Sequence, residues 1–146
     1  MSLPNLHRAL EGAWTFDRNA SSGESMAGSA RFVARGETRL HYREQGILTL
    51  VDGTELKFER SYIYEFSDAA MSIYFDTPSP RLFQSVVLTP HGKVWAGSGS
   101  HLCGADRYAS RFEFDPAWQD RFRIVHKVTG PRKDYVLETR YHRCSL

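Results

Sequence analysis

The feature that most constrains this chain is a regular alternation of side chains over residues 54–66, directly after the dipeptide Asp52-Gly53. One parity carries apolar and aromatic side chains together with a single arginine: Leu56, Phe58, Arg60, Tyr62, Tyr64 and Phe66. Successive side chains of a strand point to opposite faces, so this pattern predicts a strand with one buried face. An Asp-Gly dipeptide before such a run is typical of a hairpin turn with positive φ at both central residues.

The same period of two recurs along the chain and predicts about ten short strands. The strand-like segments are 12–18, 29–35, 37–45, 47–51, 54–66, 71–75, 81–88, 93–102, 106–114, 120–129 and 133–143. Residues 3–10 have the spacing of a short helix, residues 19–28 are small and polar and predict a mobile loop, and Gly46 predicts a break. Regularly spaced short strands favour an antiparallel meander, and closure into a barrel would remove its edges.

Composition narrows the class of protein. The 146 residues suit a single domain, 1–146, and the net charge of +2 comes without a basic block, which argues against a nucleic-acid partner. No segment approaches the roughly 18 apolar residues that span a membrane, and residues 1–10 lack the apolar core of a signal peptide. We therefore expect a cytoplasmic protein with Cys103 and Cys144 as reduced thiols.

Arg60 is the unusual residue on the inward face of its strand. A buried guanidinium is costly unless it is paired, and its planar fork suits a carboxylate or a phosphate. One interpretation is a ligand anchor, oriented with the help of Tyr62 and Tyr64. The other is an internal ion pair with Asp106 or Glu44, and the sequence leaves both open.

A second polar group comes from residues 101–108 and the strand at 120–129. His126 falls on the apolar parity of its strand, and His101, Asp106 and Tyr108 lie close together in the sequence. A histidine beside Asp106 could act as a general base, which makes His126, His101 and Asp106 candidate catalytic residues. The alternative is a structural hydrogen-bond network. With Tyr42, these residues complete the predicted lining of a binding site.

Two histidine–cysteine pairs raise the question of a metal. His101-x-Cys103 and His142-x-Cys144 each place two soft ligands on one strand face, and together they could form a tetrahedral zinc site. Typical zinc sites use other spacings, so we expect neither a metal nor another cofactor.

Gly12-x-Trp14 in the first strand and a late arginine, Arg140 or Arg143, resemble the calycin barrels, which include lipocalins and fatty-acid-binding proteins. The resemblance implies that the arginine, taken here as Arg140, packs across Trp14 and closes the barrel base. The fuller pattern resembles a bacterial family of calycin-like domains without an established activity, through Gly12-x-Trp14-x-Phe16-x-Arg18, Arg60-x-Tyr62-x-Tyr64, His101-x-Cys103-x-x-Asp106-x-Tyr108 and Gly130-Pro131-x-Lys133-Asp134-Tyr135. Haem-binding nitrobindins are also ten-stranded calycin-like barrels, and this chain lacks a match to their motifs.

The sequence therefore predicts an all-β, calycin-like antiparallel barrel that binds a small, partly apolar, anionic molecule in its interior. The predicted ligand-binding residues are Arg60, Tyr62, Tyr64, Tyr42, Tyr108, His101, His126 and Asp106. The alternatives are an enzyme that uses a buried histidine with Asp106, a nitrobindin-like haem protein, and an interaction module with a filled interior. A homodimer is left open.

Overall fold

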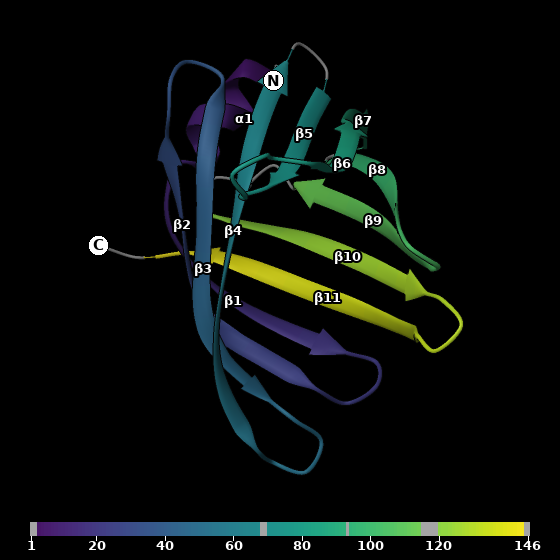
Figure 1. Ribbon diagram of the computed structural model, residues 1–146. Helices are drawn as coiled ribbons and strands as arrows, with labels where there is room; N and C mark the ends of the chain where they lie inside the picture. The colour runs from purple at the N-terminus through teal and green to yellow at the C-terminus, as the bar shows by residue number, and fades with distance from the viewer. Residues whose placement is uncertain (1–2, 68–69, 93, 115–119, 145–146) are drawn as a thin grey trace.

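The computed structural model describes residues 3–67, 70–92, 94–114 and 120–144 (Figure 1). Within these ranges the chain forms one short helix and eleven strands. Their bounds are α1 (Leu3–Leu10), β1 (Gly12–Ala20), β2 (Ser25–Ala34), β3 (Arg39–Thr49), β4 (Glu55–Ser67), β5 (Ala70–Phe75), β6 (Leu82–Val87), β7 (Thr89–His91), β8 (Val94–Cys103), β9 (Asp106–Phe114), β10 (Arg121–Thr129) and β11 (Asp134–Arg143). The expected all-β class is confirmed.

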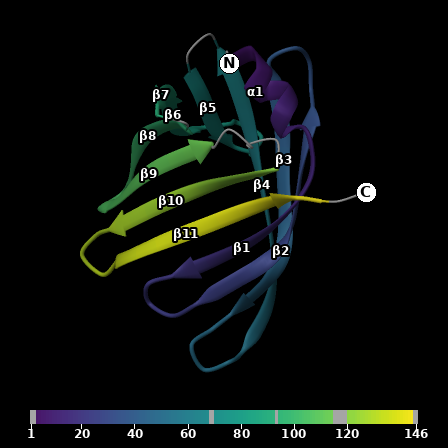
Figure 2. The ribbon, with the colours of Figure 1, turned by 180° about the vertical axis from the view of Figure 1, so that it is seen from behind.

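The strands form a single antiparallel sheet in the order β6-β5-β4-β3-β2-β1-β11-β10-β9-β8-β7. The sheet curls until β6 meets β8, which gives a nearly closed barrel (Figures 1 and 2). Gly97 on β8 permits this approach, because a Cβ atom there would lie 2.4 Å from the carbonyl oxygen of Val87 on β6. Among the described residues no ladder joins β6 to β8, and the side chain of Gln84 on β6 donates a hydrogen bond to Ser110 on β9 across this seam.

Three local expectations are corrected. The predicted loop at 19–28 is mostly strand, because β1 and β2 pair up to Asn19↔Ser25. Gly46 does not interrupt β3, since ladders with β2 and β4 hold it from both sides. The turn after β3 has positive φ at Gly53 alone, and the Asp52 carboxylate instead accepts a hydrogen bond from the amide of Thr54 at 2.9 Å.

One end of the barrel is closed by α1 and by an arginine over a tryptophan. The Arg143 guanidinium lies 4.0 Å from the Trp14 ring centre and donates hydrogen bonds to the carbonyls of Ala9 and Glu11. The prediction that Arg140 packs across Trp14 is wrong, because Arg140 is exposed and pairs with Glu138. The period of β11 explains this, because Arg143 shares the inward parity of Tyr141 whereas Arg140 points outward.

Aromatic side chains fill the interior next to this closed base. Trp14 and Phe32 are almost fully buried, and Phe122 stacks on Tyr141 with ring centres 4.2 Å apart. Within the described ranges, the single helix has neither the length nor the apolar character needed to pass through a bilayer. Because this end is filled by side chains, we look for a ligand-binding site at the other end of the barrel.

Candidate functional site

A cavity of about 760 Å³ occupies the barrel on the side away from α1. The turns after β1, β3, β8 and β10 gather around this end in both views (Figures 1 and 2). Several residues of these turns line the cavity, so this end is its mouth. Seven of the eight predicted binding residues also line it: Arg60, Tyr62, Tyr64, Tyr42, Tyr108, His101 and His126.

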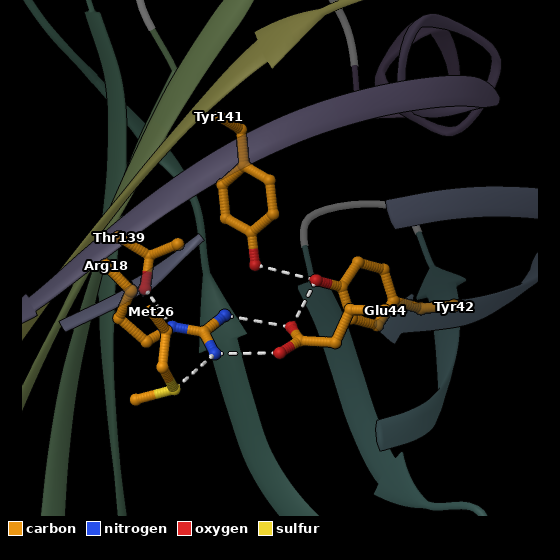
Figure 3. Close-up of polar contacts among 6 residues, drawn as sticks. All are labelled: Arg18, Met26, Tyr42, Glu44, Thr139 and Tyr141. Atoms are coloured by element: carbon orange, nitrogen blue, oxygen red, sulfur yellow. Dashed lines mark hydrogen bonds and ion pairs between the residues drawn. The ribbon is translucent and has the colours of Figure 1, made fainter. Parts of the chain in front are cut away.

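The deep wall of the cavity carries a buried ion pair that the sequence analysis did not predict. Arg18 on β1 donates to both carboxylate oxygens of Glu44 on β3, at 2.7 and 2.8 Å (Figure 3). Its Nε donates to the hydroxyl of Thr139 at 2.7 Å. The signal was present in the sequence, because Arg18 continues the inward parity of Trp14 and Phe16.

Two tyrosines complete this cluster. The Tyr42 hydroxyl donates to Glu44 at 2.5 Å and lies 2.9 Å from the hydroxyl of Tyr141 (Figure 3). Burial alone would raise the pKa of Glu44, but the hydrogen bonds and charge of Arg18 hold that pKa below its usual value. Burial raises the pKa of Tyr141 to about 12. At neutral pH the cluster is therefore an ion pair flanked by neutral phenols.

Arg60 lines the same cavity and makes no hydrogen bond or ion pair with this cluster, although its positive charge helps to lower the pKa of Glu44. Its strand neighbour across the β3–β4 ladder is Glu44, yet that carboxylate is held by Arg18. Arg60 lies beyond Tyr62, the last β4 residue paired with β5, and it is exposed. Its guanidinium sits 5.9 Å from the ring centre of Phe58 and makes no ion pair with any described residue. Access to water explains why this arginine needs no internal partner.

His126 lies on β10, on the inward face that its parity predicted. Its Nδ1 is 2.6 Å from the hydroxyl of Ser110 on β9, and Ser110 accepts from the amide of Gln84 at 2.9 Å. Burial, followed by the positive charges of Arg18 and Arg60, lowers the pKa of His126 to about 4. The ring is neutral at pH 7.

Aromatic rings form the cavity wall next to His126. Phe83 on β6 is central: its ring centre lies 6.0 Å from Tyr62, 5.4 Å from His101 and 6.2 Å from His126. The sequence analysis did not single out Phe83, although it lies within a predicted strand. This wall gives the cavity a largely apolar side next to the polar groups.

Asp106 behaves differently from expectation. It is not among the cavity-lining residues, and its carboxylate pairs with the Lys133 ammonium at 3.1 Å. Lys133 also approaches the Tyr108 hydroxyl at 3.5 Å, which joins the turn after β10 to β9 at the mouth. The predicted pairing of Asp106 with His126 does not form, because the β9–β10 register places Ser110 opposite His126.

The two histidine–cysteine pairs that were considered for a zinc site are not brought together. His101 and Cys103 lie on β8, and β9 and β10 separate that strand from β11, which carries His142. Among the described residues, no three histidine, cysteine, aspartate or glutamate side chains are grouped so that they could hold a metal ion. Cys103 and Cys144 are free thiols.

Solved structures share this fold at low sequence identity. The chain is similar to a phycobiliprotein lyase of the S type, CPES from Guillardia theta, with a TM-score of 0.72, 10% identity and coverage of 100% of this chain and 94% of that chain. It is similar to Rv2717c from M. tuberculosis, with a TM-score of 0.70, 14% identity and coverage of 97% and 96%. It is also similar to EF1p2_mFAP2b bound to DFHBI, with a TM-score of 0.54, 14% identity and coverage of 98% and 100%.

Sequence comparison adds a family. No curated protein matches the chain. A model described as a family of unknown function, DUF6314, matches residues 10–143, which span β1 to β11 and therefore nearly the whole barrel. The chain belongs to the DUF6314 family.

Proposed function

We propose that the protein binds a small, partly apolar molecule with an anionic end inside its barrel. The observation that carries this proposal is Arg60, an arginine that lines an aromatic-walled cavity and has no ion-pair partner among the described residues. A cavity of about 760 Å³ lies within the range of roughly 300–1,000 Å³ that small-molecule sites occupy. A few polar groups in an apolar pocket orient a ligand, and a guanidinium favours an anion.

The charges around the cavity support an anionic rather than a cationic ligand. Glu44, the buried acid of the wall, is neutralised by Arg18, and the Asp106 carboxylate is held by Lys133. The rim carries solvated charges of both signs, including Arg132, Glu24 and Asp134. Arg60 lines the cavity without an ion-pair partner among the described residues, which supports its role as the group that meets the anionic end of the ligand.

The neighbours in fold space are compatible with this proposal. EF1p2_mFAP2b, similar over the whole length of that chain, was solved bound to DFHBI, which is a small molecule. A shared barrel does not transfer a ligand, and the proposal therefore depends on the residues of this cavity.

Two fluorescent probes with the same aromatic skeleton test the proposal. 8-Anilinonaphthalene-1-sulfonate carries an anionic group, whereas N-phenyl-1-naphthylamine lacks it. We expect both to bind the wild-type protein. Replacing Arg60 with alanine should weaken the sulfonate about 10-fold or more, equivalent to a charge-assisted hydrogen bond of about 1.5–3 kcal/mol, and leave the neutral probe within about 2-fold.

Arg43→Ala is the matched control, because Arg43 is an exposed arginine paired with Glu59 and does not line this cavity. It should leave both affinities unchanged. Equal weakening of the two probes by Arg60→Ala would contradict the role of Arg60. Failure of both probes to bind the wild-type protein would contradict the cavity-binding function itself.

A further inference from the structure

His126 lines the cavity wall, and its Nδ1 lies 2.6 Å from the hydroxyl of Ser110. We propose that His126 is a specificity determinant that donates its Nε2–H to an acceptor oxygen of the bound molecule, with Ser110 and Gln84 as positioning residues that fix this tautomer. This inference rests on the proposed binding function and extends it from the charge of the ligand to its hydrogen-bonding pattern.

The donor and acceptor roles in the hydrogen bonds from Gln84 through Ser110 to His126 follow from Gln84, which is 1% exposed. Its Nε2 lies 3.4 Å from the backbone carbonyl of Tyr108 and 2.9 Å from the hydroxyl of Ser110. A backbone carbonyl can only accept a hydrogen bond, so the NH₂ group, and not the amide oxygen, must face Tyr108. The same NH₂ group then donates to Ser110.

Ser110 connects Gln84 to His126. Its hydroxyl oxygen accepts from Gln84, and its single proton is available for His126 Nδ1 at 2.6 Å. A neutral imidazole has one donor and one acceptor nitrogen, so an accepting Nδ1 places the ring proton on Nε2. The opposite edge of the ring, with Nε2, is left to face the cavity that His126 lines.

The surroundings of His126 favour this neutral donor. The low pKa of the ring follows from burial and from the positive charges of Arg18 and Arg60, which outweigh the opposing charge of Glu44. Nε2 makes no hydrogen bond with any described residue, and it is not among the polar atoms sealed from solvent. An accessible N–H on a wall next to Phe83 is therefore available to a guest.

The inference makes a chemical distinction among ligands. Arg60 and the His126 Nε2–H are both donors, so the wall between them selects acceptors such as carboxylate, carbonyl or other oxygen atoms. A ligand that presents only N–H or O–H donors to His126 would gain nothing from this contact. The same tautomer leaves no lone pair on Nε2, so it opposes ligation of a haem iron through that atom.

Nitrogen-15 NMR of the histidine rings tests the tautomer in the wild-type protein without a mutation. We expect Nε2 of His126 to carry the proton at pH 7. A proton on Nδ1 instead, or a charged ring at pH 7, would overturn the inference.

Two neutral probes test the contact to the ligand. 1-Benzoylnaphthalene has a carbonyl where 1-benzylnaphthalene has a methylene group, and each can compete with N-phenyl-1-naphthylamine for the cavity. His126→Phe keeps a ring of similar shape and removes the donor. It should weaken the ketone about 3- to 10-fold relative to the hydrocarbon, as expected for one hydrogen bond.

Variants of the positioning residue complete the test. Ser110→Ala should weaken the ketone selectively by about 2- to 5-fold, and Ser110→Thr, which keeps the hydroxyl, should restore it. Equal effects on ketone and hydrocarbon in both His126→Phe and Ser110→Ala would overturn the inference while leaving cavity binding intact. If N-phenyl-1-naphthylamine does not bind at all, the proposed function fails, and the ligand contact fails with it.

Discussion

Two sets of polar side chains face the same barrel interior and use their hydrogen bonds in opposite ways. Arg18, Glu44, Tyr42 and Tyr141 bond to one another, and the ion pair is 6% and 2% exposed. Arg60 and the Nε2 edge of His126 make no such bonds with described residues and lie against open space. The comparison teaches that interior polarity alone does not mark a binding group. A buried charge needs a partner within the protein, whereas an accessible hydrogen-bond donor is free to bind a ligand.

The largest effect on stability should come from breaking the buried ion pair between Arg18 and Glu44. Replacing Arg18 with methionine leaves Glu44 buried without its cation, and we expect a loss of about 3–5 kcal/mol in the free energy of unfolding. Arg43→Met, which breaks the exposed pair with Glu59, should cost no more than about 1 kcal/mol. Urea denaturation of the two variants measures the difference.

The double variant Arg18→Met, Glu44→Leu sharpens this result. Because it removes both charges, it should recover most of the stability lost by Arg18→Met alone. A double variant as unstable as the single variant would show that the ion pair is not the reason for the loss.

An intermediate effect concerns the pH dependence of stability. His126 titrates near pH 4 in the folded protein and near 6.5 when unfolded, so the unfolded state binds more protons between these values. Stability should therefore fall as the pH drops from about 6.5 to 4, with His126 contributing about 1–3 kcal/mol of that fall. Carboxylates also titrate at the lower end, so the relevant quantity is the difference from His126→Phe.

That difference can be measured by thermal or urea unfolding at pH 7, 5.5 and 4. His126→Phe should lose less stability than the wild-type protein across this range. Parallel pH profiles for the two proteins would mean that His126 is not held neutral by the fold.

The smallest effect on stability is expected from replacing Arg60. Arg60 has no internal ion-pair partner, so Arg60→Ala should change the free energy of unfolding by no more than about 0.5 kcal/mol. The same variant should weaken the anionic probe strongly. A large loss of stability, measured by urea denaturation, would show that Arg60 has a structural partner within the protein.

The sequence carries most of the fold and part of the site. The period of two predicted most of the strands and put Arg60 and His126 on the parity that lines the cavity, and helical spacing predicted the helix at residues 3–10. The same parity could have identified Arg18 and could have favoured Arg143 over Arg140, because both lie on inward positions of their strands.

Other parts of the site depend on the tertiary structure. Gln84 and Ser110 look like ordinary polar strand residues, and their connection exists because β6 approaches β8 and β9 across a seam without a regular ladder. The partner of Asp106 also depends on register, which places Ser110 and not Asp106 opposite His126. Periodicity assigns a residue to a face, but it does not say which residue of another strand it will meet.

The central claim is that an acidic, partly apolar guest lies between Arg60 and His126, and an NMR titration with 8-anilinonaphthalene-1-sulfonate tests it most directly. We predict saturable shifts of the Arg60 Nε–H and of the His126 ring, with contacts from the probe to Phe83. Shifts confined to the outer surface, or no saturable change in either side chain, would contradict the claim.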